Sequence, residues 1–370
     1  MTQIDQTALT SVASATSPQL SLGKRLYYGK TNYKFTQKRR RWYIVSSIVI
    51  LIGVITLSVR GLNFGIEFKG GTSWQVTDSA LTVAKAKSAI SPIGLKQAVI
   101  VSLGSNKNTT IEVQADLSQY QPNERSIIEN KVTSDLAKAA AISTSKVSLN
   151  DVGPTWGGEI TSKAIRALIG FFIAISLYIT IRFEVKMALA ALVAVVHDIL
   201  VTIGIYAITG FDVTPATVIA LLTILGYSLY DTIVVFDRVK ENVKGLVDSG
   251  KMRYSDCVDY SMNQVLMRSI NTSIIAIIPI LSILVIGAEI LGASTLQQFG
   301  LALFIGLTTG AYSSLFVASP LLASLKEREA KYAQIALRLE AKETREKKKE
   351  ERSQAKGKDN NVKDRTRAKA

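Results

Sequence analysis

Six long apolar segments constrain the fold of this 370-residue sequence more than any other feature. Each segment is long enough, and poor enough in charge, to cross a hydrocarbon core of about 30 Å as a single helix. Inside a bilayer only helices and closed barrels satisfy every backbone hydrogen bond, so these segments predict membrane-spanning helices. The six segments are 43–59, 164–181, 187–208, 216–236, 269–291 and 299–322.

The first apolar segment follows basic residues, an arrangement that is also typical of a signal peptide. Here a polar and basic stretch of about 40 residues precedes the segment, and no small-x-small cleavage pattern follows Val59. We therefore predict that the first segment is a retained membrane anchor.

Basic residues are concentrated at the two ends of the chain. Residues 1–41 hold eight Lys or Arg and one acid, and residues 326–370 hold sixteen Lys or Arg and nine acids. Each end therefore contributes +7 to a formal net charge of +15. With six spans both ends lie on one side of the membrane, and the excess of Lys and Arg predicts that this side is the cytoplasm.

The basic tail combines helix-forming residues with very few apolar ones. This composition predicts a helix in the first half of the tail and disorder over about the last 20 residues. Two interpretations remain open. The tail either contacts anionic lipid headgroups or ribosomal RNA, or only fixes the topology and keeps the end soluble.

The segment between the first two spans predicts a small folded domain outside the membrane. Its patterns alternate in the order βαββαβ, which is typical of a ferredoxin-like α+β sandwich. Residues 60–163 hold eleven basic and nine acidic side chains, so no nucleic-acid surface is indicated. The expected strands are 70–76, 97–103, 109–115 and 146–152, and the expected helices are 81–94 and 122–141.

Together these features predict an α-helical polytopic membrane protein that carries a small extracytoplasmic α+β domain. The division follows the apolar and charged stretches of the sequence. The predicted parts are a basic cytoplasmic segment at 1–41, a first transmembrane helix at 42–60, the extracytoplasmic domain at 61–163, a five-helix transmembrane region at 164–323 and a basic, partly disordered cytoplasmic tail at 324–370.

Three ionisable residues lie at the predicted spans, where each costs at least about 2.5–3.5 kcal/mol to insert. Asp231 lies in the inner half of span four and Arg268 opens span five, so helix geometry brings both toward the cytoplasmic side. Asp198 lies deeper, near the middle of span three. Two carboxylates near an arginine are what a proton relay requires, because each acid can load and release a proton. A static buried salt bridge is the alternative.

His197, the only histidine, precedes Asp198 and is either an auxiliary member of the relay or a hydrogen-bonded interior residue. A single histidine excludes a His-rich metal site, and the single cysteine, Cys257, excludes an intramolecular disulfide. We therefore expect no metal, no catalytic centre and no cofactor beyond a proton gradient.

Two groups of small residues have structural interpretations. Gly70 and Gly71 lack the GK[ST] pattern of a phosphate-binding loop, so a sharp turn that leads into a strand is the better interpretation. Small residues inside the spans predict close helix packing, which also lets helices slide past each other. These residues are Gly300, Gly306, Gly310, Ser313 and Ser314 in span six, and Gly226 and Ser228 in span four.

Five stretches of the sequence carry a resemblance to a known family: GLNFGIEFKGGT (61–72), VGPTWGGEI (152–160), VAVVHDILVTIGIY (193–206), GYSLYDTIVVFDRVKEN (226–242) and SMNQVLMRSINTS (261–273). They occur in the order found in the SecF family, which the chain resembles over residues 40–325. Members are the smaller membrane subunits of the bacterial SecDF protein-export complex and are related to the RND transporters. The most specific stretch is GYSLYDTIVVFDRVKEN, at 226–242, within a longer match that begins at Phe211.

The resemblance implies a six-span, RND-like half in the bacterial cytoplasmic membrane, with both termini cytoplasmic. Asp231 and Arg268 fall on the charged transmembrane positions of the family, and Asp198 follows the family's histidine. It also implies a translocase subunit, not an enzyme, that uses the proton-motive force to help polypeptides leave the SecYEG channel on the outer side. The implied partners are a SecD-like subunit, SecYEG, the translocating polypeptide, YajC and YidC, to which the charge map adds anionic lipids at the basic termini and no specific nucleic acid.

Two residues depart from the family pattern. Glu67 stands where an aspartate is more common, which is a mild chemical change. Tyr230 stands beside Asp231, where many members have an asparagine. This leaves open whether the phenol of Tyr230 replaces an amide hydrogen bond to Asp231.

Two other functions fit a helical membrane protein with charges inside its spans. An RND-like exporter of small molecules or lipids would usually carry a much larger external domain in each half. A non-transporting scaffold would use Asp231 and Arg268 only as a structural pair, and a double charge swap would then keep full function.

Overall fold

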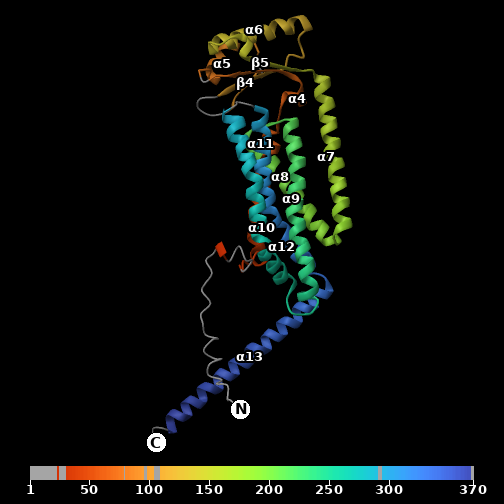
Figure 1. Ribbon diagram of the computed structural model, residues 1–370, viewed down its shortest axis with the longest axis vertical. Helices are drawn as coiled ribbons and strands as arrows, with labels where there is room; N and C mark the ends of the chain where they lie inside the picture. The colour runs from red at the N-terminus through yellow and green to blue at the C-terminus, as the bar shows by residue number, and fades with distance from the viewer. Residues whose placement is uncertain are drawn as a thin grey trace, which may run out of the picture.

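A bundle of long helices carries a small α/β domain at one end and a single long helix at the other (Figure 1). Most of the predicted N-terminal segment 1–41 lies outside the described residues. The computed structural model describes residues 23–24, 31–78, 80–95, 98–103, 109–290 and 294–367.

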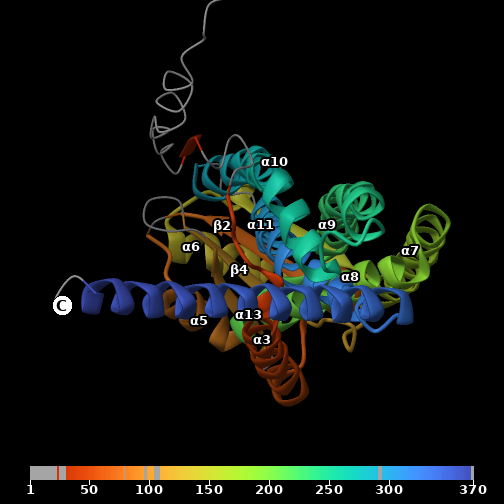
Figure 2. The ribbon, with the colours of Figure 1, turned by 90° about the horizontal axis from the view of Figure 1, so that it is seen from below.

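Six helices in the described part of the chain are long and apolar enough to cross a membrane, as expected. The helices that form these spans are α3 (Arg39–Arg60), α7 (Pro154–Arg182), α8 (Val185–Thr209), α9 (Pro215–Asn242), α10 (Tyr254–Ser282) and α11 (Ser294–Ser313). The helices α8, α9 and α11 form the interior of the bundle, whereas α3, α7 and α10 expose apolar side chains around them. Figure 2 shows α7 at the edge of the bundle, where one of its faces packs against the core.

Glycines set the closest approaches between the helices. A Cβ atom on Gly53 of α3 would lie 2.7 Å from the Cα atom of Gly204 of α8. A Cβ atom on Gly310 of α11 would lie 2.9 Å from the Cβ atom of Ser228 of α9. Small residues allow membrane helices to pack this closely, so the expected packing role of Gly310 is confirmed.

The α/β domain has the expected ferredoxin-like topology. Its elements are β2 (Gly71–Thr77), α5 (Val83–Ile90), β3 (Val99–Leu103), β4 (Thr110–Ala115), α6 (Pro122–Ala140) and β5 (Val147–Val152). The strands lie in the order β3-β4-β2-β5 and every pair is antiparallel, so each βαβ unit has one strand of the other unit between its own two. The two helices cover one face of the sheet, where Trp74 and Val113 pack with Leu136 in one core.

A short parallel pairing, which the sequence did not suggest, joins the α/β domain to the bundle. Strand β1 (Asn63–Phe64) pairs with β6 (Asp212–Val213), which lies between α8 and α9. A four-residue helix, α4 (Ile66–Lys69), follows β1 and ends at Gly70 and Gly71, whose φ angles are 78° and 133°. Glycine adopts such angles without strain, so the pair makes the turn into β2 that we expected.

Two helices begin earlier than their apolar segments indicated. Helix α7 starts at Pro154 rather than near residue 164, and α10 starts at Tyr254 rather than near residue 269. A helix satisfies its own backbone hydrogen bonds inside and outside the membrane alike, so it need not end where the apolar stretch ends. As a consequence, Arg268 lies in the middle of α10 and does not open it.

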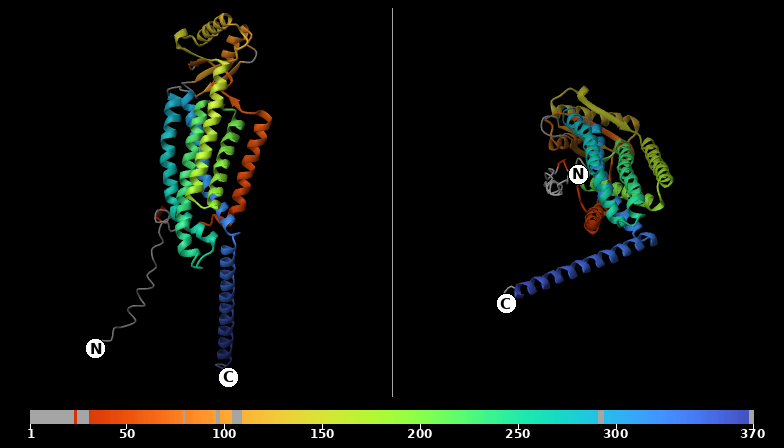
Figure 3. Two further views of the ribbon diagram at one scale, coloured as in Figure 1. Left: turned by 90° about the vertical axis from the view of Figure 1, so that its right-hand side faces the viewer. Right: turned by 60° about the horizontal axis from the view of Figure 1, so that its bottom comes forward.

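The chain after α11 continues as a π-helical turn, η6 (Ser314–Ala318), then α12 (Ser319–Lys326) and α13 (Ala330–Arg367). Helix α13 projects away from the bundle in the views of Figures 1 and 3. It continues to Arg367, over the stretch for which we expected disorder, because Lys, Glu, Arg and Ala favour helix. The Lys331–Asp248 and Arg253–Glu343 ion pairs, of 2.8 and 2.9 Å, tie α13 to the α9–α10 connection. The shorter elements are η1 (Thr36–Lys38), η2 (Ser91–Ile93), η3 (Thr144–Lys146), η4 (Val243–Val247) and η5 (Ile283–Ile290).

Candidate functional site

Asp198, in the middle of α8, is held by three hydrogen bonds inside the bundle. Its side chain is 1% exposed. One carboxylate oxygen lies 3.0 Å from Nδ1 of His197, and the other accepts from Ser228 Oγ at 2.5 Å and from Ser313 Oγ at 2.8 Å. The donors come from α8, α9 and α11, so this single carboxylate joins the three interior helices.

Asp231, on α9, has a similar environment made of different residues. Its side chain is 5% exposed. One oxygen accepts from Ser269 Oγ of α10 at 2.6 Å, and the other accepts from the hydroxyl of Ser314, the first residue of η6. Ser228 lies one turn before Asp231 on α9, so this helix donates to the first acid and carries the second.

The predicted contact between Asp231 and Arg268 is not formed. Among the ion pairs of the described residues, none joins Asp231 to a Lys or Arg. Instead, Nη2 of Arg268 donates to the hydroxyl of Tyr230 at 3.2 Å, in an exposed contact on the outside of α9 and α10. The phenol of Tyr230 therefore does not replace an amide at Asp231.

Helix geometry explains this outcome. Successive residues on an α-helix point about 100° apart, so neighbours in the sequence face different sides. Asp231 and Ser269 face inward and pair, while their neighbours Tyr230 and Arg268 face outward and pair. A rotation of α10 by one residue would bring Arg268, in place of Ser269, toward Asp231.

His197 extends the polar group at Asp198 toward α3. Its ring lies almost parallel to that of Tyr312, with ring centres 6.0 Å apart, and the Tyr312 hydroxyl lies 3.2 Å from Ser46 Oγ. Within the described part of the chain, Nε2 of His197 is buried without a hydrogen-bond partner.

The chemistry that this arrangement permits is proton uptake and release. An ionised carboxylate without a cation is costly in a low-dielectric interior, and taking up a proton is the alternative. A serine hydroxyl donates to a carboxylate and also accepts from a protonated carboxyl group, so both forms of each acid find partners. Nowhere in the described residues do three or more His, Cys, Asp or Glu side chains gather in a way that could hold a metal ion.

Sequence reasoning missed the serines that donate to the two acids. Ser228, Ser313 and Ser314 were interpreted as packing residues only, and Ser269 was not singled out. The available signal was the Ser228–Asp231 spacing of three, which places a hydroxyl and an acid on neighbouring positions of one helix face. The residues across the interface depend on how α8, α9, α10 and α11 are rotated, which this spacing does not specify.

A second group of carboxylates lies where β4 and β6 meet, and we name it the junction. The carboxylate of Asp212 accepts from Nε2 of Gln114 at 3.2 Å and from the amide of Asn63, and the same Gln114 nitrogen lies 3.3 Å from Glu112. Burial raises the pKa of Asp212, Glu112 and Glu67, and the negative charge of Asp212 adds to the rise at both glutamates. The junction therefore attaches the sheet to the α8–α9 hairpin through partly buried acids.

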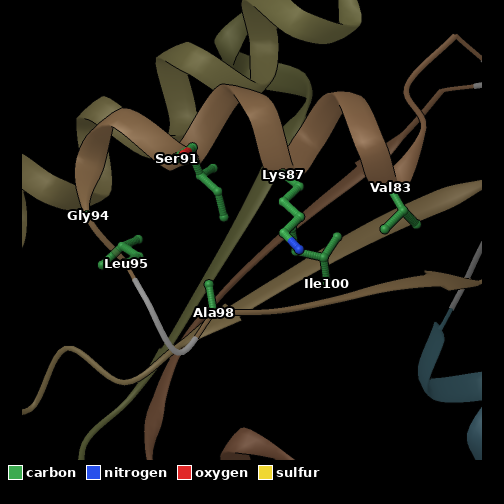
Figure 4. Close-up of a pocket in the computed structure, with 8 residues that line it drawn as sticks. Val83, Lys87, Ser91, Gly94, Leu95, Ala98 and Ile100 are labelled. Carbon is green, nitrogen blue, oxygen red and sulfur yellow. The ribbon is translucent and has the colours of Figure 1, made fainter.

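The α/β domain also has an open depression of about 480 Å³ between α5 and the edge strand β3 (Figure 4). Its lining is mainly apolar, and Lys87 extends across it toward Ile100. The depression belongs to the α/β domain and contains neither transmembrane acid. The other lining residues are Val83, Ile90, Ser91, Gly94, Leu95 and Ala98.

Comparisons with known proteins show the family to which the chain belongs. Residues 131–328 match the family described as "Protein export membrane protein SecD/SecF, C-terminal". Residues 55–77 match the "SecD/SecF GG Motif", which includes the Gly70–Gly71 turn. The chain is 40% identical over 323 residues to the protein translocase subunit SecF of Streptomyces coelicolor, covering 87% of this chain and 84% of the relative.

Longer proteins also match. The chain is 33% identical over 302 residues to the protein translocase subunit SecDF of Bacillus subtilis, covering 81% of this chain and 39% of that relative. The crystal structure of SecDF from Thermus thermophilus superposes with a TM-score of 0.70 at 30% identity, covering 81% of this chain and 39% of that one. A SecDF structure in a super-membrane-facing form superposes with a TM-score of 0.58 at 29% identity, covering 83% and 40%. The chain is a member of the SecD/SecF family of protein-export membrane proteins.

Proposed function

We propose that this chain is the SecF-like subunit of the Sec protein-export machinery. Together with a SecD-like partner it uses the proton-motive force to promote the translocation and release of polypeptides on the outer side of the cytoplasmic membrane. It is a transport subunit and not an enzyme, and the proton gradient takes the place of a cofactor. The observation that carries the proposal is the pair of buried carboxylates, Asp198 and Asp231, held by hydroxyls inside the six-helix bundle.

Asp231 and Asp198 are the proton-carrying residues in this proposal. Each has hydroxyl partners that satisfy it with and without a proton, and His197 gives Asp198 a second titratable neighbour. Arg268 and Tyr230 form a charged, exposed pair one residue away from the inner contact between Ser269 and Asp231. In the relay, Arg268 and Tyr230 act from the exposed face of α9 and α10. There the positive charge of Arg268 changes the electrostatic potential at Asp231 without contacting it.

A SecD-like subunit is the first partner in the proposal. The relatives named SecDF are more than twice as long as the part that this chain matches. The other proposed partners are SecYEG, the polypeptide in transit, YajC, YidC and anionic lipids at the basic termini. The family resemblance and the charge map support these partners. Co-purification from native membranes is the test for the protein partners, with recovery of a SecD-like chain and the channel as the expected result.

The orientation with both termini in the cytoplasm is part of the same proposal. It rests on the charge of the two ends, since Lys and Arg are retained on the inner side. Single cysteines placed in α13 and in the α/β domain of a Cys257→Ser chain are the test. A reagent that does not cross the membrane should label only the α/β domain in intact cells.

The central experiment measures export into inverted membrane vesicles that contain the chain and its partner. We expect Asp231→Asn and Asp198→Asn to insert and assemble normally but to lose the stimulation of export by a proton gradient. Asp237→Asn is the matched control, because it lies on the same helix in a partly exposed ion pair with Arg182. Normal stimulation in the Asp231→Asn protein would exclude a proton-carrying role for this acid.

The polypeptide substrate can be tested at the depression beside β3. A photo-reactive residue at Ser91 or Ile100 should cross-link to an arrested export intermediate, because an edge strand offers unpaired backbone groups beside an apolar surface. A photo-reactive residue at Leu149, on the opposite edge strand β5, is the matched position. Equal cross-linking at both edges would argue against a specific contact at the depression.

A further inference from the structure

Two consecutive serines at the end of α11 contact different acids. Ser313 and Ser314 are fully buried, and the helix changes from α to π geometry between them. Ser313 donates to Asp198, and Ser314 donates to Asp231. Asp198 lies on α8 and Asp231 on α9. The two consecutive serines, at the boundary between α11 and η6, connect these proposed proton carriers.

Each of these serines also has a second acceptor within reach. Ser313 Oγ lies 2.8 Å from Asp198 and 3.2 Å from the carbonyl oxygen of Gly310. Ser314 Oγ lies within hydrogen-bond distance of Asp231 and 3.2 Å from the carbonyl oxygen of Ala311. A hydroxyl has one proton, so each serine donates strongly to only one of its two acceptors at a time.

The protonation state of the acid decides which acceptor is used. An ionised carboxylate attracts the hydroxyl proton most, because a charge-assisted hydrogen bond is stronger than a neutral one. When the acid takes up a proton, its own O–H donates to the serine oxygen, and the serine proton turns to the backbone carbonyl three residues before. No covalent bond of the serine changes, since the added proton stays on the acid and the hydroxyl only rotates.

The other two hydroxyl partners lack this alternative. The donor contacts of Ser228 and Ser269 within the described residues lead only to Asp198 and Asp231. Neither Ser228 nor Ser269 has a backbone carbonyl as an alternative acceptor among these contacts. A change in protonation of the acids therefore changes hydrogen bonds to the backbone only at Ser313 and Ser314.

The local geometry makes the backbone sensitive to this change. Serine bonding to a carbonyl of the preceding turn bends helices, and π-helical turns are frequent at functional sites. The carbonyl of Ser314 already accepts from Ser319 Oγ at 2.8 Å, inside the π turn. Gly310 packs against Ser228 with no room for a Cβ atom, so a bend in α11 is transmitted to α9.

We propose that Ser313 and Ser314 form a hydrogen-bond switch that converts protonation of Asp198 and Asp231 into a change of shape at the α11–η6 boundary. They are positioning residues that act through the two acids. The proposal rests on the proposed function only in requiring that these acids take up protons.

The first test records pH-difference infrared spectra of the full chain in lipid vesicles. Asp198→Asn and Asp231→Asn each remove one carboxyl C=O band and so assign both bands. We expect Ser313→Ala to shift the Asp198 band alone and Ser314→Ala to shift the Asp231 band alone. Threonine at either position keeps the hydroxyl and should leave the bands in place, and Thr308→Ala, an exposed hydroxyl on the same helix, is the matched control.

The second test measures hydrogen exchange over residues 311–318 at one constant pH. Asp231→Asn mimics the neutral acid, because its amide donates to Ser314 as a protonated carboxyl group would. We expect this change to alter the exchange rate about 2- to 12-fold, the effect of one hydrogen bond, and to have no effect when Ser314 is alanine. If the alanine variants do not fold, Ser314→Cys keeps a weak donor of similar volume, and the Asp231 band should still shift.

The outcomes separate this proposal from the proposed function. Titrating carboxyl bands that ignore Ser313 and Ser314 would overturn the switch and leave proton-driven export standing. An Asp231→Asn effect on exchange that survives Ser314→Ala would do the same. The absence of any titrating carboxyl band would overturn both, because neither acid would then carry a proton.

Discussion

The bundle interior and the junction both bury carboxylates, but they hold them with different chemical groups. In the interior, Asp198 and Asp231 accept mainly from serine hydroxyls. At the junction, Asp212 accepts from the side-chain amides of Asn63 and Gln114. An amide nitrogen can only donate, so a change of charge there changes the strength of attachment. A hydroxyl can also accept, so a change of charge in the interior can reverse the direction of a hydrogen bond.

This difference suits two separate tasks. The junction attaches one domain to another, and its strength depends on charge while its donors stay in place. In the proposed function the interior must be stable with and without protons, because a proton carrier passes through both states.

The largest effect should come from removing the hydroxyls that hold Asp198. Ser228→Ala combined with Ser313→Ala leaves the buried carboxylate with His197 alone, so we expect the free energy of unfolding to fall by about 2–5 kcal/mol. Unfolding of the purified protein in detergent measures this change. The matched control is Thr223→Ala with Thr308→Ala, two exposed hydroxyls on the same helices that bond only to backbone carbonyls. A double variant as stable as the control would show that the hydroxyls do not stabilise Asp198.

Removing the amide at the junction should loosen the domain without affecting the bundle. Gln114→Leu removes the donor that joins β4 to Asp212, and we expect the attachment to weaken by about 1–3 kcal/mol. Hydrogen exchange should become faster at β1 and β6 and stay unchanged in α8 and α9. Thr77→Val, which removes a hydroxyl pair at the far end of the same sheet, is the control. Faster exchange throughout the bundle would contradict the separation of the two regions.

The attachment at the junction should also depend on pH. Burial raises the pKa of Asp212 from 3.8, and that of Glu112 and Glu67 from 4.5. The attached state therefore binds protons more readily than the detached state. The stabilisation is complete below the ordinary carboxyl pKa values and is lost as the pH rises through the raised ones.

Hydrogen exchange at β1 and β6, corrected for its intrinsic pH dependence, measures this effect. We expect protection to decrease as the pH rises through this range in the unmodified protein. Asp212→Asn should flatten the dependence, because it removes both the titrating group and its repulsion of Glu112 and Glu67. A steeper pH dependence of protection in the Asp212→Asn variant would contradict the assignment of this dependence to Asp212.

The smallest effect on stability should come from the exposed contact between Arg268 and Tyr230. Tyr230→Phe removes the acceptor of the Arg268 contact on an exposed surface, so we expect a change in unfolding free energy of about 0–1 kcal/mol. Ser269→Ala, one position away on the inner side, should cost more because Asp231 loses a buried donor. Equal losses in the two variants would show that the inner and outer faces are not distinct.

Some of this architecture could be predicted from the sequence because it depends on local patterns. The lengths of the apolar segments specify six spans, and the alternation of patterns in 61–163 specifies the βαββαβ order. Asp198 and Asp231 were identified as unusual because insertion of a charge is costly wherever the helices pack. Helices α7 and α10 begin before their apolar segments, since an apolar segment marks the membrane and not the end of a helix.

The contacts of those acids were decided only by the tertiary structure. The contact between Ser313 and Asp198 spans 115 residues, and the contact between Ser314 and Asp231 spans 83. Each depends on how a helix is rotated about its axis, where an error of one residue turns a side chain by about 100°. The sequence therefore determined that two carboxylates lie inside a six-helix bundle. Only the packing of the helices decided that serines, and not Arg268, hold them.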